Sequence, residues 1–76
     1  MNEVTIYINN ISDVNTFLHI ASKSKYNLTL CSDIYKADAK SLLGLLSLNL
    51  SEPIILKYDE IEPDLLEEIK KYEVVR

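Results

Sequence analysis

The sequence predicts an α+β fold, an open-faced two-layer β-sandwich in which helices cover one face of a four-stranded antiparallel sheet. Two observations predict it. Two segments alternate polar and apolar residues, as strands do, two further short segments between turn residues can pair with them, and three others repeat apolar residues every three or four positions, as helices do. Their order is strand, helix, strand, strand, helix, strand, helix (βαββαβα), and right-handed connections then place the helices on one face.

The size of the chain predicts a single domain spanning residues 1–76. With 76 residues, 47% of them hydrophobic, the chain cannot hold a second core. A domain of this size buries only about 60% of the surface of its unfolded chain, which leaves little room for an interior active site. We therefore expect a surface or loop site, and we do not expect an enzyme.

The charge pattern and the short apolar runs exclude two classes of partner, nucleic acids and membranes. The net charge is −4, and the basic residues, seven lysines and Arg76, form none of the clustered stripes that nucleic-acid backbones require. No apolar run is long enough to span a membrane, and no signal peptide is recognisable. We expect a cytoplasmic protein without nucleic-acid or membrane partners.

The first half of the chain predicts a strand, a helix and a hairpin. Residues Glu3 to Ile8 alternate and predict the strand. Ser12 or Asp13 is expected to cap the helix, which should end near Ser24 or Lys25. Its apolar stripe consists of Val14, Phe17, Leu18 and Ala21.

The hairpin is expected from an alternating segment and a short partner strand separated by a turn. Tyr26 to Cys31 forms the first strand and Ile34 to Ala37 the second, with Ser32-Asp33 supplying the turn.

The second half predicts a short helix, a strand and a longer helix. Asp38 or Ser41 should open the short helix and Asn49 should end it. After Pro53, residues Ile54 to Tyr58 predict the fourth strand. Pro63 should begin the last helix, with Ile61 packing on Leu66, and its expected buried side is Leu65, Leu66, Ile69 and Tyr72.

The short helix carries more leucines than one face can bury. A two-turn helix cannot hide Leu42, Leu43 and Leu46 together, so some must be exposed. Two interpretations remain open: a hydrophobic edge of the core, or a docking patch for a protein partner.

The short helix also carries a family likeness, in Asp38-Ala39-Lys40-Ser41-Leu42-Leu43-Gly44-Leu45-Leu46-Ser47-Leu48. This stretch resembles the regulatory-serine segment of HPr, the histidine-containing phosphocarrier protein of the bacterial sugar phosphotransferase system, and the order of elements on both sides agrees. The resemblance implies an HPr-like open-faced sandwich, protein partners that bind the short helix and the phosphocarrier loop, and a kinase that phosphorylates the serine at position 41.

The phosphocarrier loop departs from the family pattern. The family has Gly, an aliphatic residue, His, Ala or Thr, Arg and Pro between the first strand and the first helix. Here the loop reads Asn9-Asn10-Ile11-Ser12-Asp13-Val14, about three residues shorter, without the histidine that accepts phosphate or the arginine that holds it. The resemblance therefore implies a degenerate, HPr-like member that has lost phosphohistidine transfer.

Other candidate residues have ordinary structural interpretations. His19 is expected on the solvent side of the first helix, with only Lys23 nearby to hold a phosphate. Cys31 has no neighbouring ligand or activating group, and the acidic residues near turns are expected to be caps and solvated charges. We expect no metal and no cofactor.

Ser41 has two compatible interpretations. A serine at a helix start satisfies a free backbone N–H, and the resemblance makes it a regulatory phosphorylation site with Lys40 adjacent.

The sequence thus predicts an HPr-like regulatory or protein-binding module, whose partners would be a serine kinase or a transcription regulator. Two alternatives remain: a divergent phosphocarrier that uses His19 or another residue, and an interaction domain that kept only the fold.

Overall fold

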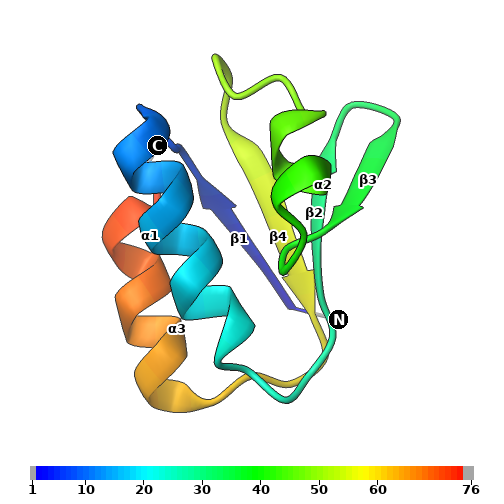
Figure 1. Cartoon of the computed structure of the whole chain (residues 1–76). Coiled ribbons are helices and arrows are strands. Elements are labelled where there is room, and N and C mark those ends of the chain that lie inside the picture. Colours follow the sequence, from blue (N-terminus) through cyan, green and yellow to red (C-terminus); the bar gives the residue numbers. More distant parts are fainter. Residues whose placement is uncertain (1, 75–76) are drawn as a thin grey trace.

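One antiparallel sheet organises the molecule in this computed structural model, which describes residues 2–74. Its strands are β1 (Asn2–Ile6), β2 (Leu28–Ser32), β3 (Tyr35–Asp38) and β4 (Ile54–Tyr58), in the order β1-β4-β2-β3. Every pairing between neighbours is antiparallel (Figure 1). The predicted sheet is confirmed.

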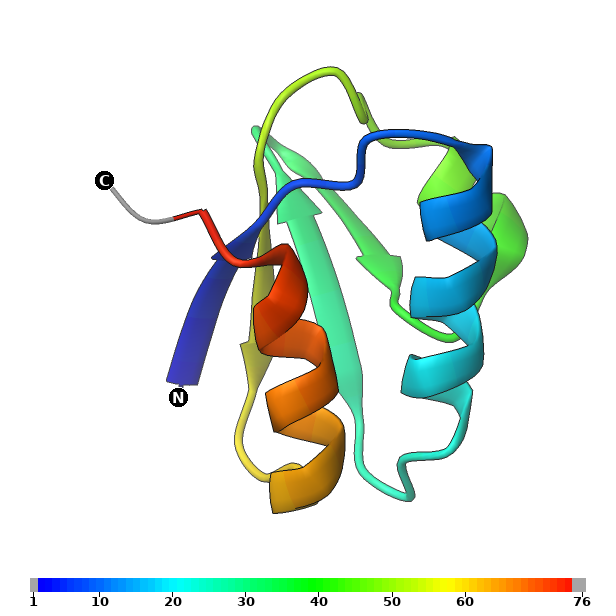
Figure 2. The same ribbon diagram turned by 90° about the vertical axis from the view of Figure 1, so that its left-hand side faces the viewer.

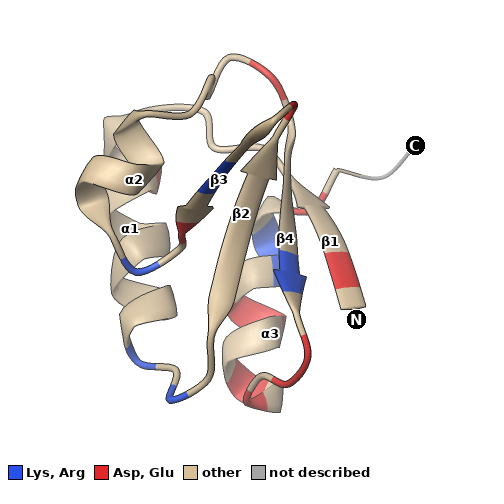
Figure 3. Ribbon diagram, turned by 90° about the vertical axis from the view of Figure 1, so that its right-hand side faces the viewer, with Lys and Arg blue, Asp and Glu red and all other residues tan. Residues whose placement is uncertain are grey.

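Three helices cover one face of this sheet. They are α1 (Ile11–Ser22), α2 (Leu42–Leu46) and α3 (Pro63–Ile69), and a 3₁₀ turn at Lys70–Tyr72 continues α3. Figure 2 shows α1 and α3 side by side against the sheet, while Figure 3 shows the opposite face, where the strands lie in front of the helices. The fold is therefore the predicted open-faced α+β sandwich.

The core lies between the sheet and the helices. Side chains alternate along each strand, so one set points towards the helices and is buried. Phe17 of α1 is fully buried and meets the ring of Tyr72 edge to face, with ring centroids 6.1 Å apart. The remaining fully buried large side chains are Ile6, Leu28, Leu30, Leu45, Ile54, Leu56 and Ile69.

The start of α1 differs from the prediction. Asn10, and not Ser12 or Asp13, caps the helix, because its extended backbone lets Oδ1 accept the N–H of Asp13 at 2.9 Å. The preceding strand ends at Ile6 because Tyr7 N–H leaves the sheet pairing and donates to the Tyr72 carbonyl at 2.9 Å.

The apolar stripe and the end of α1 also differ. Ile20 is buried, whereas Leu18 is only half-buried, so the buried face is turned slightly from the predicted one. The helix ends at Ser22, short of Ser24 and Lys25, because Lys23 and Ser24 close it with short-range bonds to the carbonyls of Ile20 and Ala21.

The hairpin turn is one residue later than predicted. Its two turn residues are Asp33 and Ile34, and Asp33 has φ of 52°, a conformation that aspartate tolerates better than most residues. Because the turn moves, β2 runs from Leu28 to Ser32 and β3 begins at Tyr35.

The last two elements follow the prediction more closely. The bounds of β4 are as predicted, and Pro63 is the first residue of α3. Leu65 and Ile69 are buried, while Leu66 and Tyr72 are half-buried against the core.

The end of α2 was predicted wrongly. The helix ends at Leu46, before Asn49, because Ser47 caps it and its Oγ donates to the Gly44 carbonyl at 2.6 Å.

Candidate functional site

Ser41 is the cap of α2. Its backbone is extended, and Oγ accepts the N–H of Gly44 at 3.1 Å. Asp38, the alternative cap, lies one turn earlier, where its Oδ1 accepts the N–H of Lys40 at 2.9 Å. The capping role predicted for Ser41 is therefore confirmed, and its hydroxyl is half-buried beside the helix start.

The leucines of α2 divide into a buried and an exposed set. Leu45 is fully buried in the core. Leu43 is 82% exposed, Leu46 48% and Leu42 43%. The prediction that some of these leucines must be exposed is confirmed, and we call Leu42, Leu43 and Leu46 the α2 patch.

Gly44 explains why α2 presents this side outward. A Cβ at Gly44 would lie 3.1 Å from the Cβ of Ala37 and 3.4 Å from the carbonyl oxygen of Asp38, so the helix packs very closely on β3. Because the Gly44 side of α2 contacts the sheet and Leu45 points into the core, the α2 patch lies on the remaining sides of the helix and stays partly exposed.

The loop between β1 and α1, residues 7–10, carries no histidine and no basic side chain. Its side chains are Tyr7, Ile8, Asn9 and Asn10. The loop borders an open depression of about 390 Å³, also lined by Ile11, Val14, Leu50 and Ser51. Tyr7 and Ile11 are 38% and 67% exposed. The depression is lined without a histidine, an arginine or a lysine.

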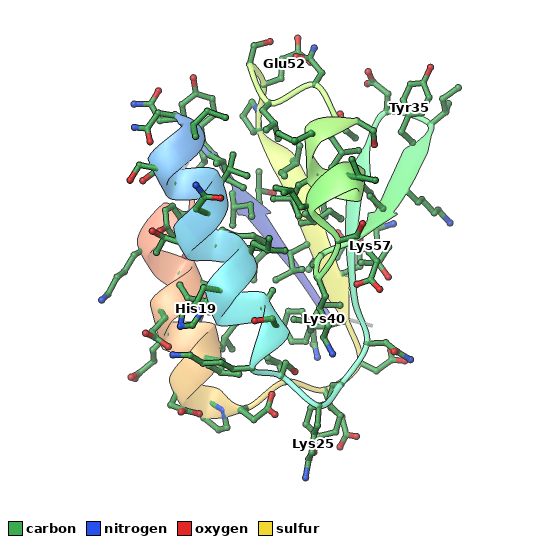
Figure 4. The ribbon with its side chains drawn as sticks, viewed as in Figure 1. His19, Lys25, Tyr35, Lys40, Glu52 and Lys57 are labelled. Atoms are coloured by element: carbon green, nitrogen blue, oxygen red, sulfur yellow. The ribbon has the colours of Figure 1, made fainter. Side chains whose placement is uncertain are left out.

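His19 lies far along α1 from this loop. It is exposed, eight residues beyond Ile11, which is about 12 Å along the helix axis. In Figure 4 its side chain lies on the outer side of α1. The structure does not bring His19 to the loop or to the α2 patch.

Cys31 and the carboxylates do not form a reactive group. Cys31 is buried in β2, paired across the sheet with Lys36 and Ile55. Within residues 2–74, no three histidine, cysteine or acidic side chains lie close enough together to hold a metal ion. In Figure 3 basic and acidic residues are scattered over the open face.

Two charged contacts were not foreseen from the sequence. Lys40, expected beside Ser41, instead donates from Nζ to the carbonyl oxygen of Ser24 at 2.7 Å. Glu62 accepts from Ser24 Oγ at 2.7 Å and from Lys25 N–H at 3.0 Å. These residues are far apart in sequence, so no local pattern could have revealed the contacts.

The fold and the site define an HPr-like protein architecture. A crystal structure described as HPr-C-His from Thermoanaerobacter tengcongensis is similar to the chain, with a TM-score of 0.77 and 28% sequence identity. The match covers 93% of this chain and 89% of the other. No family model and no curated protein matches the sequence. In the part of the chain that the structure describes, no helix has the length and apolar character needed to cross a membrane.

Proposed function

We propose that the chain is a cytoplasmic, HPr-like regulatory or protein-binding module, acting as a single domain, that has lost phosphohistidine transfer. The similar structure carries the name HPr, and the proposal assigns no enzymatic activity to this chain. The loop of residues 7–10 lacks both the histidine nucleophile and the cation that phosphohistidine transfer needs. The function then depends on binding.

The α2 patch carries this proposal. Three leucines next to each other in space, one of them 82% exposed, are costly to keep in water without a partner. The patch adjoins Ser41, so a modification there would change the charge at its rim. A protein that covers the leucines and senses this charge, such as a transcription regulator, is the partner class that fits.

Ser41 is the proposed regulatory site. A serine kinase would transfer the γ-phosphoryl group of a nucleoside triphosphate to Oγ, with loss of the hydroxyl proton and release of the diphosphate. The phosphate adds about −1.5 to −2 charge and strong acceptor oxygens. Regulation would then need no catalysis by this chain.

Lysine substitutions in the α2 patch test the binding proposal. Leu43→Lys combined with Leu46→Lys should abolish capture of the partner from a lysate of the source, while circular dichroism shows an intact fold. Ile34→Lys is the matched control, because Ile34 is 87% exposed at the hairpin turn, outside the patch. An unchanged set of captured proteins for the double variant would contradict the patch.

Mass spectrometry tests the modification. After incubation with the serine kinase of the phosphotransferase system and ATP, we expect one added phosphate in the unmodified protein and in Ser47→Ala, and none in Ser41→Ala. The absence of any added phosphate would contradict regulation at Ser41 and would favour a domain that kept only the fold.

A further inference from the structure

Ser24 is the centre of a hydrogen-bonded group at the end of α1. The residue is only 4% exposed, and its Oγ donates to Glu62 while accepting the N–H of Tyr26 at 3.1 Å. Its carbonyl oxygen accepts from Lys40 Nζ at 2.7 Å. Glu62 also accepts the N–H of Lys25. We call these residues the Ser24 cluster; it joins the end of α1 to the starts of α2 and α3.

Lys40 is the member of the Ser24 cluster that directly precedes Ser41. Its ammonium contacts a neutral carbonyl, and no described carboxylate lies within ion-pair distance of it. Figure 4 shows Lys40 and Lys25 at the same end of the molecule, where α1 ends. A new negative charge at position 41 would therefore meet a cation that is held only by a neutral acceptor.

We propose that Lys40 couples modification of Ser41 to the Ser24 cluster. A phosphate on Ser41 draws the Lys40 ammonium away from the Ser24 carbonyl and so loosens the attachment of the end of α1. This inference rests on the proposed function, because it takes Ser41 as the modified residue. It adds a structural consequence at α1 to the change of charge beside the α2 patch.

The relative strengths of the two contacts favour this exchange. Both contacts use the charged ammonium as donor, but a phosphate dianion carries a full opposite charge and is therefore a stronger partner for it than a carbonyl dipole. The flexible four-carbon stem of lysine lets the ammonium turn to a neighbouring residue without moving the backbone. After the exchange, Ser24 keeps the Oγ contacts to Glu62 and Tyr26 and its backbone N–H bond to the Ala21 carbonyl, but its own carbonyl loses the Lys40 ammonium.

The test uses the full chain with phosphoserine at position 41, made by chemical synthesis with ligation at Cys31. The ¹³C signal of the Ser24 carbonyl and the ¹⁵N signal of Lys25 report on the Lys40 contact. We expect both to move in the direction that Lys40→Met produces in the unphosphorylated protein. In a chain that carries both Lys40→Met and the phosphoserine, we expect no further movement.

Phosphoserine at Ser12 is the matched control, because Ser12 is exposed at the opposite end of α1. It adds the same charge and should leave the Ser24 carbonyl signal unchanged. Unmoved signals with phosphoserine at position 41, or equal movement when Lys40 is methionine, would overturn the inference. Because synthesis installs the phosphate, failure of the kinase reaction would contradict the proposed regulation without affecting this result.

Discussion

Two single side chains, Ser41 and Glu62, each fix the conformation of a neighbouring segment of the backbone. Ser41 fixes where α2 begins, because its hydroxyl accepts the N–H of Gly44, which has no hydrogen-bond partner within the helix. Glu62 fixes the loop after α1, because its carboxylate binds one side-chain hydroxyl and one backbone N–H of that loop. Each role can be removed by changing one residue.

Ser41→Ala should lower the free energy of unfolding by about 0.5–2 kcal/mol, the usual cost of losing a helix cap. Ser41→Asn should lose much less, because asparagine also caps helices well. Urea unfolding followed by circular dichroism measures both. An equal midpoint for Ser41→Ala and the unmodified protein would show that α2 begins elsewhere.

Glu62 should make stability depend on acid. The backbone hydrogen bond from Lys25 and the hydroxyl of Ser24 lower the pKa of Glu62 below its ordinary value of 4.5. A lowered carboxyl pKa gives stability that is present above 4.5 and lost as the pH falls through the folded-state value.

The variant Glu62→Gln should therefore lose less stability on acidification than the unmodified protein, as measured by urea unfolding between neutral pH and pH values below 4.5. Glu67→Gln, exposed on α3, serves as the control and should follow the unmodified protein. If Glu62→Gln showed the full acid loss, the carboxylate would not contribute through these bonds.

At the level of elements, α2 combines one anchoring leucine with an exposed patch. Its ladder of hydrogen bonds is too short to be stable alone, so packing must hold it. Leu45 supplies that packing from inside the core, and Gly44 allows the close approach to Ala37. The fold is thereby anchored through Leu45 and Gly44, while the side chains of the α2 patch stay exposed.

Alanine substitutions separate the two kinds of leucine. Leu45→Ala should reduce the free energy of unfolding by about 2–5 kcal/mol, because it leaves a cavity in the core. Leu43→Ala should change it by no more than about 0.5 kcal/mol, since the side chain is 82% exposed. Thermal or urea unfolding of both proteins checks this, and similar losses would mean that Leu43 also packs in the core.

An element could be predicted from the sequence when the residues that determine it lie within the element itself. Alternation located β4, and Pro63 located α3, because those signals lie within the element itself. The turn at Asp33 and the end of α2 at Leu46 depend on backbone geometry that several nearby residues could have adopted. The Ser24 cluster joins residues 38 positions apart, which no local pattern encodes.

At the scale of the whole molecule, the chain combines an HPr-like sandwich with a loop, residues 7–10, that departs from the HPr pattern. The fold is similar to that of the HPr crystal structure, with a TM-score of 0.77, while residues 7–10 contain no histidine or arginine. The only histidine of the chain, His19, is exposed and lies about 12 Å along the axis of α1 from Ile11, the first residue of that helix. The proposed binding role rests on this loop and not on the fold, which the chain shares with HPr.

A phosphotransfer assay tests this central claim most directly. The chain is incubated with phosphoenolpyruvate and the general enzyme of the phosphotransferase system, beside an active HPr as positive control, and its intact mass is measured. We predict no acid-labile phosphate on the chain. An acid-labile adduct of one phosphate, lost in His19→Ala, would contradict the account and identify a divergent phosphocarrier that uses His19.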